Sequence, residues 1–154
     1  MSHPFTDQDL YFMQRAMELA KIGGSQQEVP VGAVLVENQK IIAEGYNAPI
    51  SNSDATAHAE IQAIRAACIV KKNYRLPQTT FYLTLEPCAM CAGAIVHSRI
   101  KRIIIAAKEP RAGAAGSVIN ILQNPKLNHQ CEVEFGLLAE QSSEMLKYFF
   151  KSRR

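Results

Sequence analysis

Several features that define other protein classes are missing from this sequence. It has no apolar run of about 18 residues or more, which argues against a membrane protein. Its first twenty residues interleave acidic and basic side chains and contain no uninterrupted apolar segment, so we expect no secretory signal and a cytoplasmic location. Repeats, low-complexity tracts and linkers are also absent, which predicts that residues 1–154 form a single domain.

Cysteine is scarce as well, with four residues in the chain. In a reducing cytoplasm disulfides are rare, so a close pair of cysteines is better interpreted as metal-binding or catalytic. Cys88 and Cys91 form such a pair, directly after Pro87 in the stretch "TLEPCAMCAGAIVHSRI". The pair fits a redox dithiol, half of a structural zinc site or half of a catalytic metal site.

The charge is mildly basic and unevenly distributed, with a net value of +3. The carboxyl end, "KYFFKSRR" at 147–154, holds four basic residues and three aromatic residues without an acid. Basic side chains beside aromatic rings offer phosphate contacts together with stacking surfaces for nucleic-acid bases. Taken alone, the segment is better explained as a solvated helix end whose aromatic residues pack in the core.

The first half of the chain predicts a helix, a hairpin and a second helix. Thr6 and Asp9 form a capping box ahead of apolar residues at helical spacing, and Gly23–Gly24 end that run. The stretch "VPVGAVLVENQKIIAEGYN" predicts two strands joined by a polar turn at 38–40. A second helix is expected to begin at "HAEIQAIRAACIVKK".

The second half continues the alternation of strands and helices. "TTFYLTLE" and "RIKRIIIAA" predict strands, and "CAMCAGAIVHS" between them predicts a short helix. A glycine-rich loop should lead to a short helix near 118–122, followed by a strand at "CEVEF" and a final helix after Gly136. This order argues for an α/β fold with one mixed sheet covered by helices on both faces.

Two thiolates and an imidazole around zinc, with the fourth position open to water, form a catalytic arrangement, whereas a structural site uses four protein ligands. Cys88 and Cys91 can place both sulfurs on one side of a helix, whose N-terminus favours thiolates. The two other cysteines are expected to be structural. Cys68 falls on an apolar helix face, and Cys131 falls beside a strand.

Four histidines are available to complete such a set. His3 belongs to the N-terminal tail, and His97 stands at the far end of the cysteine helix, about 13 Å along its axis, too far for the same ion. His129 follows "NPKLN" in a loop, so spacing leaves it open, although no acid stands beside it. His58 differs because it opens a predicted helix together with an acid.

That acid is Glu60, about 200° around a regular helix from His58. It is therefore not expected to bind the ion from the same side, and it is suited to take a proton from zinc-bound water and pass it on. Singly, each residue fits a plainer explanation, such as helix-start electrostatics or a thioredoxin-type dithiol. Jointly, HAE opening one helix and PCxxC opening another after a strand match the signature of zinc-dependent nucleobase deaminases.

Over almost its whole length the chain resembles the bacterial tRNA-specific adenosine deaminases, within the cytidine deaminase-like superfamily. Matching stretches include "EVPVGAVLV", "TAHAEIQAIR", "TLEPCAMCAGAIVHSRI" and "GAAGS". The resemblance implies a three-layer cytidine deaminase-like fold with a mixed five-stranded sheet. It also implies a homodimer, with one Zn²⁺ per subunit, that converts the wobble adenosine of a tRNA anticodon stem-loop to inosine.

By the same resemblance, His58, Cys88 and Cys91 are the zinc ligands and Glu60 is the proton shuttle. Asn47 would hydrogen-bond the flipped nucleotide, since an amide both donates and accepts. Without the resemblance, Asn47 fits a turn residue equally well.

The other implied substrate contacts fall into two groups. Residues resembling the apolar wall of the base pocket are Val29, Pro49 and Leu85. Residues resembling contacts to the anticodon loop are Arg111 and the segment from Phe149 to Arg153. Glu109 stands where the family usually has aspartate, and its longer arm leaves open its reach to a ribose hydroxyl and any preference between RNA and DNA.

Three rival functions use the same residues. A deaminase of free bases or nucleotides, such as guanine or cytidine compounds, would need the same zinc site, although the basic aromatic tail argues against it. A zinc-stabilised RNA-binding module would need no proton shuttle. A thiol oxidoreductase would cycle the close cysteine pair and need no metal.

Overall fold

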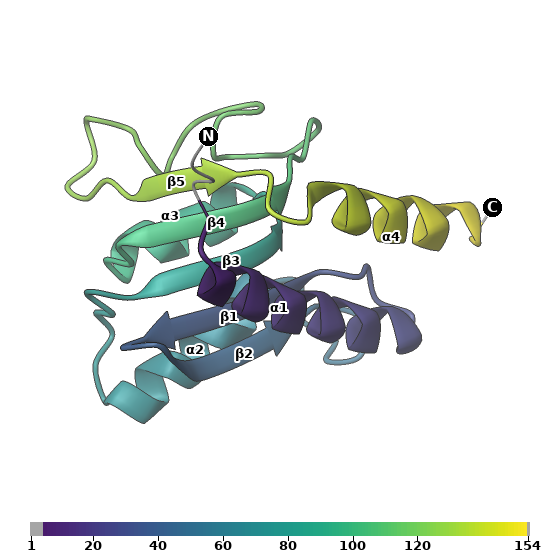
Figure 1. Ribbon diagram of the computed structural model, residues 1–154, viewed down its shortest axis with the longest axis horizontal. Coiled ribbons are helices and arrows are strands. Elements are labelled where there is room, and N and C mark those ends of the chain that lie inside the picture. Colours follow the sequence, from purple (N-terminus) through teal and green to yellow (C-terminus); the bar gives the residue numbers. More distant parts are fainter. Residues whose placement is uncertain (1–4, 154) are drawn as a thin grey trace.

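A five-stranded mixed sheet forms the centre of the computed structural model, which describes residues 5–153 (Figure 1). The spatial order is β2-β1-β3-β4-β5, in which β1 runs antiparallel to β2 and β3 while β3, β4 and β5 are parallel. The strands are β1 (Gly32–Glu37), β2 (Lys40–Tyr46), β3 (Thr80–Leu85), β4 (Arg102–Ala107) and β5 (Glu132–Phe135).

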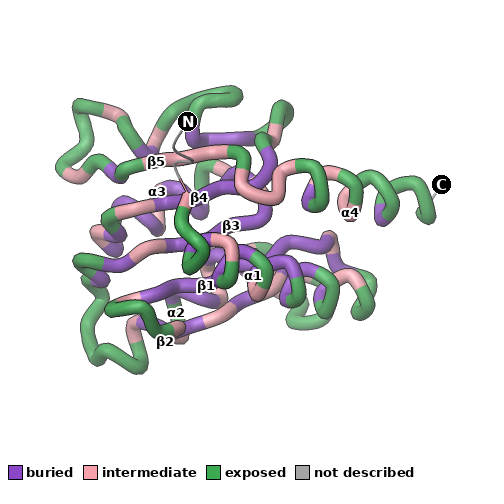
Figure 2. The backbone as a smooth tube through the Cα atoms, in the orientation of Figure 1, coloured by how far each residue is buried: buried purple, intermediate pink, exposed green. Residues whose placement is uncertain are grey.

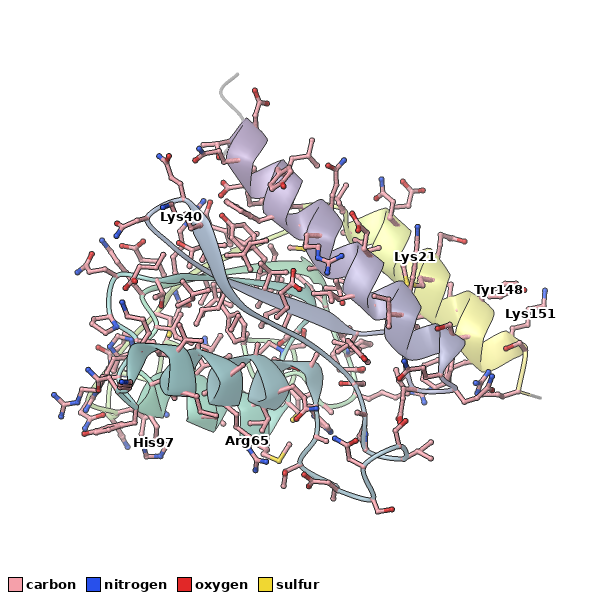
Figure 3. The ribbon with its side chains drawn as sticks, turned by 90° about the horizontal axis from the view of Figure 1, so that it is seen from below. Lys21, Lys40, Arg65, His97, Tyr148 and Lys151 are labelled. Atoms are coloured by element: carbon pink, nitrogen blue, oxygen red, sulfur yellow. The ribbon has the colours of Figure 1, made fainter. Side chains whose placement is uncertain are left out.

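Helices cover both faces of this sheet, as the sequence predicts. Helices α1 (Asp7–Ser25) and α4 (Ala139–Lys151) lie on one face, and α2 (Ala59–Lys71) and α3 (Ala89–His97) lie on the other (Figures 1 and 3). The architecture is therefore the three-layer α/β fold expected of the cytidine deaminase-like superfamily. Among the described residues, no helix combines the length and hydropathy that crossing a membrane requires.

Strand residues alternate between two apolar cores. In β1, Ala33 and Leu35 face the core under α2 and α3, whereas Val34 and Val36 face the core under α1. This alternation follows from the two-residue period of a strand. In Figure 2 the central strands are accordingly buried, and the outward sides of the helices and the loops are exposed.

Strand directions bring four chain segments to one edge of the sheet. Gly32 at the start of β1 pairs with Tyr46 at the end of β2, and Leu85 at the end of β3 pairs with Ala107 at the end of β4. Because β1 is antiparallel to β3, the start of β1 and the end of β3 lie at the same edge. The segments entering β1 and leaving β2, β3 and β4 therefore meet there.

The structure corrects the sequence prediction at two places. Segment 118–122 is not a helix: Val118 and Ile119 both donate their N–H groups to the Gly113 carbonyl, at 3.0 and 3.2 Å. Their side chains are exposed, so the local apolar pattern does not mark a buried helix face. In addition, α1 continues through Gly23–Gly24 to Ser25 and gives way to a turn where the φ of Gln27 is 70°.

Candidate active site

The three predicted metal ligands converge at the sheet edge described above. The Nδ1 atom of His58 lies 3.6 Å from the sulfur of Cys88 and 3.5 Å from the sulfur of Cys91. All three ligand atoms lie within 4.8 Å of one another. Both cysteines are free thiols, so the pair is not closed as a disulfide.

Two helix starts supply these ligands. His58 is the N-cap of α2 and Cys88 is the N-cap of α3, each one position before the first helical turn in which the sequence predicts it. Cys91 follows in the first turn of α3 and is fully buried. The imidazole of His58 makes no capping hydrogen bond to its own helix, which leaves it free to bind a metal.

The start of α2 is positioned by β2 and by Asn47. A side chain at Gly45 would collide with the carbonyl of Ala59, so glycine is what lets the first turn of α2 rest directly on β2. Asn47 is buried, and its Oδ1 accepts the N–H of Ala59 at 2.8 Å. Asn47 therefore provides the capping bond that His58 does not make.

Glu60 lies beside the three ligands but outside their group. It is the second residue of α2 and is only 4% exposed. Burial raises the pKa of its carboxyl to about 7, because the charged form loses its contact with water. A cation held by the three ligands would favour the charged form again. The position suits a group that exchanges protons with a molecule bound at the metal.

The thiols have unequal proton affinities. A hydrogen bond from the Cys91 thiol, together with N–H groups at the start of α3, lowers the pKa of Cys88 to about 5. The same thiol–thiol bond raises the pKa of Cys91. Binding a divalent metal would replace the shared proton and satisfy both sulfurs as thiolates.

The donor chemistry fits zinc. Two sulfurs and one imidazole nitrogen are zinc donors, and in a four-coordinate site they leave one position that no residue of the described chain supplies. The other histidines do not complete the set. His97 is exposed on α3 (Figure 3), His129 bonds the carbonyl of Ile100 at 2.8 Å, and His3 lies outside the described residues.

The remaining cysteines lie apart from this group, as predicted. Cys131 is buried next to β5, and Cys68 is only half-buried near the end of α2, so its predicted place in the core is only partly realised.

Two surface hollows are lined by residues other than the three ligands. One, of about 310 Å³, is lined in part by Tyr46 and Gln62, and another, of about 600 Å³, lies between α1 and α4.

The residues predicted to contact substrate lie along the same edge. Val29 and Leu85 are half-buried against the core, and Pro49 is half-buried in the loop between β2 and α2. Glu109 and Arg111 lie in the loop after β4, where Glu109 Oε1 accepts the N–H of Arg111 at 2.9 Å. The Glu109 carboxylate is thus already engaged within its own loop.

The aromatic residues of the basic tail are divided between burial and exposure. Phe149 is buried, with the guanidinium of Arg153 only 3.6 Å from its ring centre. Arg153 also donates to Oε1 of Gln27 at 2.7 Å. Tyr148 and Phe150 are the exposed aromatic residues of this helix, at 78% and 51% exposure. Arg154 lies outside the described residues.

Two buried carboxylates at the site edge were missed by sequence reasoning. Glu28 and Glu86 are each 2% exposed and accept hydrogen bonds from loop backbone. Glu86 stands between the strand and the PCxxC motif, where an acid directly after an apolar strand is a usable signal. Glu28 has no comparable signal, because its partners at Ile50 and Ser51 are distant in sequence.

Comparison with known proteins agrees with this geometry. The family model "Cytidine and deoxycytidylate deaminase zinc-binding region" matches residues 6–107. The tRNA-specific adenosine deaminase of Haemophilus influenzae is 50% identical over 147 residues, covering 95% of this chain and 85% of that protein. The protein of the same name from Bacillus subtilis is 43% identical, covering 96% and 91%.

Solved structures show the same fold. One, from studies of A-to-I editing by tRNA:A34 deaminases at the wobble position of transfer RNA, matches with a TM-score of 0.85 and 42% identity, covering 88% of this chain and 99% of that one. A guanine deaminase from Nitrosomonas europaea matches with a TM-score of 0.76 at 22% identity, covering 97% and 85%. The latter similarity concerns the fold alone.

Proposed function

The chain belongs to the tRNA-specific adenosine deaminases, and from that premise we propose that it hydrolyses the wobble adenosine of a tRNA anticodon loop to inosine. One observation carries the proposal: one imidazole and two thiols converge beside a buried carboxylate, in a chain 50% identical to a protein of that family. The runner-up is a zinc-dependent deaminase of a free base or nucleotide. Because a guanine deaminase shares the fold, free bases and nucleosides are compared with the stem-loop in the experiment below.

His58, Cys88 and Cys91 would hold one zinc ion per subunit. Zinc, when bound, supplies Lewis-acid chemistry that makes solvent nucleophilic near neutral pH. Glu60 stands beside His58 at the start of α2 but outside the group of ligand atoms. Its carboxylate is therefore not needed to bind the metal.

Glu60 moves the protons of the reaction. It takes a proton from the attacking water as the new bond to the purine C6 forms, and it delivers a proton to the ring nitrogen beside that carbon. It then transfers the second proton of the water to the amino group, whose bond to C6 breaks. Water is consumed and ammonia is released, and Glu60 ends in its starting state. Because Glu60 is buried, bulk water does not exchange protons with it during this transfer.

Asn47 is proposed to bind the flipped nucleotide with its amide NH₂ group, because its Oδ1 already accepts the N–H of Ala59. The same side chain would then fix both the substrate and the helix that carries His58. Val29, Pro49 and Leu85 are proposed as the apolar wall around the base. Their half-burial at the site edge supports this role.

Anticodon-loop contacts are proposed for Glu109, Arg111 and the tail. Arg111 is exposed, so its guanidinium can contact a phosphate. Phe149 is covered by Arg153, so we propose that its ring orients the guanidinium of Arg153. We propose that the exposed ring of Phe150 stacks on a base.

A cytoplasmic homodimer is also part of the proposal. Ile69 and Val70, near the end of α2, are 76% and 62% exposed, and such apolar side chains are available to a second copy. Light scattering on the purified protein should give twice the mass of one chain. A fully active particle with the mass of a single chain would contradict the dimer.

The substrate is tested by comparing four compounds at equal concentration. We expect inosine to form from an anticodon stem-loop carrying adenosine at position 34, and little or no ammonia to be released from free guanine, adenosine or cytidine. Ammonia released only from the small molecules would overturn the assignment. The zinc-stabilised RNA-binding module predicts no ammonia from any compound.

A further inference from the structure

Glu86 is a buried carboxylate without a cationic partner. It follows β3 directly, precedes Pro87 and Cys88, and is 2% exposed. Among the described residues it takes part in none of the ion pairs. Burying a charge without a counter-charge is costly unless several hydrogen bonds satisfy it. Its hydrogen-bond donors therefore identify what the carboxylate holds.

All four donors to this carboxylate come from one loop, residues 109–117. Oε1 accepts the N–H of Glu109 at 3.0 Å and a short bond from the hydroxyl of Ser117. Oε2 accepts the N–H of Ala115 at 2.9 Å and the N–H of Ser117 at 3.1 Å. Each oxygen therefore accepts two hydrogen bonds, and the four donors together come from both ends of the same loop.

The loop is shaped around the carboxylate. A side chain on Gly113 would collide with the carboxyl group of Glu86, so only glycine allows the backbone to pass this close. The N–H of Ala114 donates to the carbonyl of Pro87 at 2.8 Å, which joins the loop to the segment leading into Cys88. The loop and the start of α3 are thus held together as one unit.

The same loop carries two of the proposed RNA contacts, Glu109 and Arg111. We propose that Glu86 is a positioning residue, which sets the distance between these contacts and the metal centre by fixing the 109–117 loop. This inference rests on the proposed function, since it concerns how the anticodon loop is placed over the zinc. Glu86 touches neither the substrate nor the metal in this role, and it acts through the loop.

The test is Glu86→Gln, which keeps the size of the side chain. An amide has one acceptor oxygen, so its NH₂ group must face two of the four donors and repel them. We expect backbone amides of residues 109–117 to exchange hydrogen about tenfold faster or more, as for a locally opened loop. Zinc content should stay at one ion per chain. The KM for the anticodon stem-loop should rise about tenfold, while kcat falls less than about threefold.

Glu28→Gln is the matched control. Glu28 is equally buried and also accepts loop donors, but these hydrogen bonds come from Ile50 and Ser51 and not from the 109–117 loop. Faster exchange in this variant should be confined to the loop between β2 and α2. Should Glu86→Gln fail to fold, Ser117→Ala removes one donor hydroxyl and should change exchange and KM in the same direction by a smaller factor.

Unchanged exchange in residues 109–117 of Glu86→Gln would overturn the inference. So would faster exchange with an unchanged KM, because Glu86 would then be only structural. A wild-type protein that does not deaminate the stem-loop would instead refute the proposed function, and with it the RNA part of this inference. Hydrogen exchange needs no substrate, so the two failures are distinguishable.

Discussion

The first turns of α1 and α2 each bury a carboxylate, and the fold treats the two in opposite ways. Asp9 is 2% exposed and accepts hydrogen bonds from the backbone of Thr6, the hydroxyl of Tyr82 and the guanidinium of Arg102. Glu60 is 4% exposed and takes part in none of the ion pairs found among the described residues.

Their proton affinities differ accordingly. Burial alone would raise the pKa of Asp9, but the bonds from Arg102, Thr6 and Tyr82 outweigh it and lower the pKa below its usual value. Burial raises the pKa of Glu60 to about 7. Asp9 is therefore a fixed charge that ties α1 to the sheet, whereas Glu60 remains able to exchange a proton. In the proposed mechanism, stability and chemistry therefore rest on separate carboxylates.

The largest expected effect comes from Glu60→Gln. An amide cannot carry protons between water and the leaving amine, so turnover on the anticodon stem-loop should fall by about 10³-fold or more. Zinc content and melting temperature should match those of the wild type. Single-turnover inosine formation and elemental analysis measure the two properties. Activity within about tenfold of the wild type would contradict the assignment of proton transfer to Glu60.

The variant Cys91→Ala tests the metal site beside Glu60. With one thiolate missing, zinc per chain should fall to below about a tenth, and activity should fall with it. Cys68→Ala is the control, because Cys68 is a thiol outside the site and should keep both zinc and activity. Zinc retained by Cys91→Ala would mean that other residues bind it.

Asp9→Asn should have the opposite profile. Removing the charge weakens the hydrogen bonds from Arg102, which keeps its ion pair with Glu134, so the free energy of unfolding at neutral pH should fall by about 2 kcal/mol. Turnover at a temperature where the variant is folded should stay within about twofold of the wild type. Urea denaturation gives the first value. An unchanged unfolding free energy would show that Asp9 does not hold α1.

The pH dependence of that loss is the smallest effect. The pKa of Asp9 is lower in the folded chain than its ordinary value of 3.8, so the folded state favours the charged form. Its stabilisation is present above that value and is lost as the pH falls through the folded pKa. The stability difference between wild type and Asp9→Asn should therefore be constant near pH 7 and shrink below about pH 4. A difference that grew on acidification would contradict this assignment.

Much of the fold and the metal centre was predictable because local rules decide them. The Thr6–Asp9 capping box starts α1 as expected, and the polar turn at 38–40 joins β1 to β2. The ligands His58, Cys88 and Cys91 were identifiable because two short motifs open two helices, and helix starts at one sheet edge can face each other.

The failures concern contacts between distant parts of the chain. Segment 118–122 has apolar residues at helical spacing, yet the loop before it is held by Glu86 from another element. The capping bond from Asn47 to the start of α2 and the burial of Phe149 likewise depend on tertiary placement. Periodicity and spacing do not contain that information.

X-ray absorption spectroscopy at the zinc edge measures the atoms that bind the metal in the proposed open zinc site. We expect two sulfur donors at about 2.3 Å and two nitrogen or oxygen donors at about 2.0 Å, with His58 supplying one nitrogen and the last position filled from outside the chain. The spectrum should be the same in Glu60→Gln. A third sulfur donor, or a donor that disappears in Glu60→Gln, would contradict an open zinc site served by a separate carboxylate.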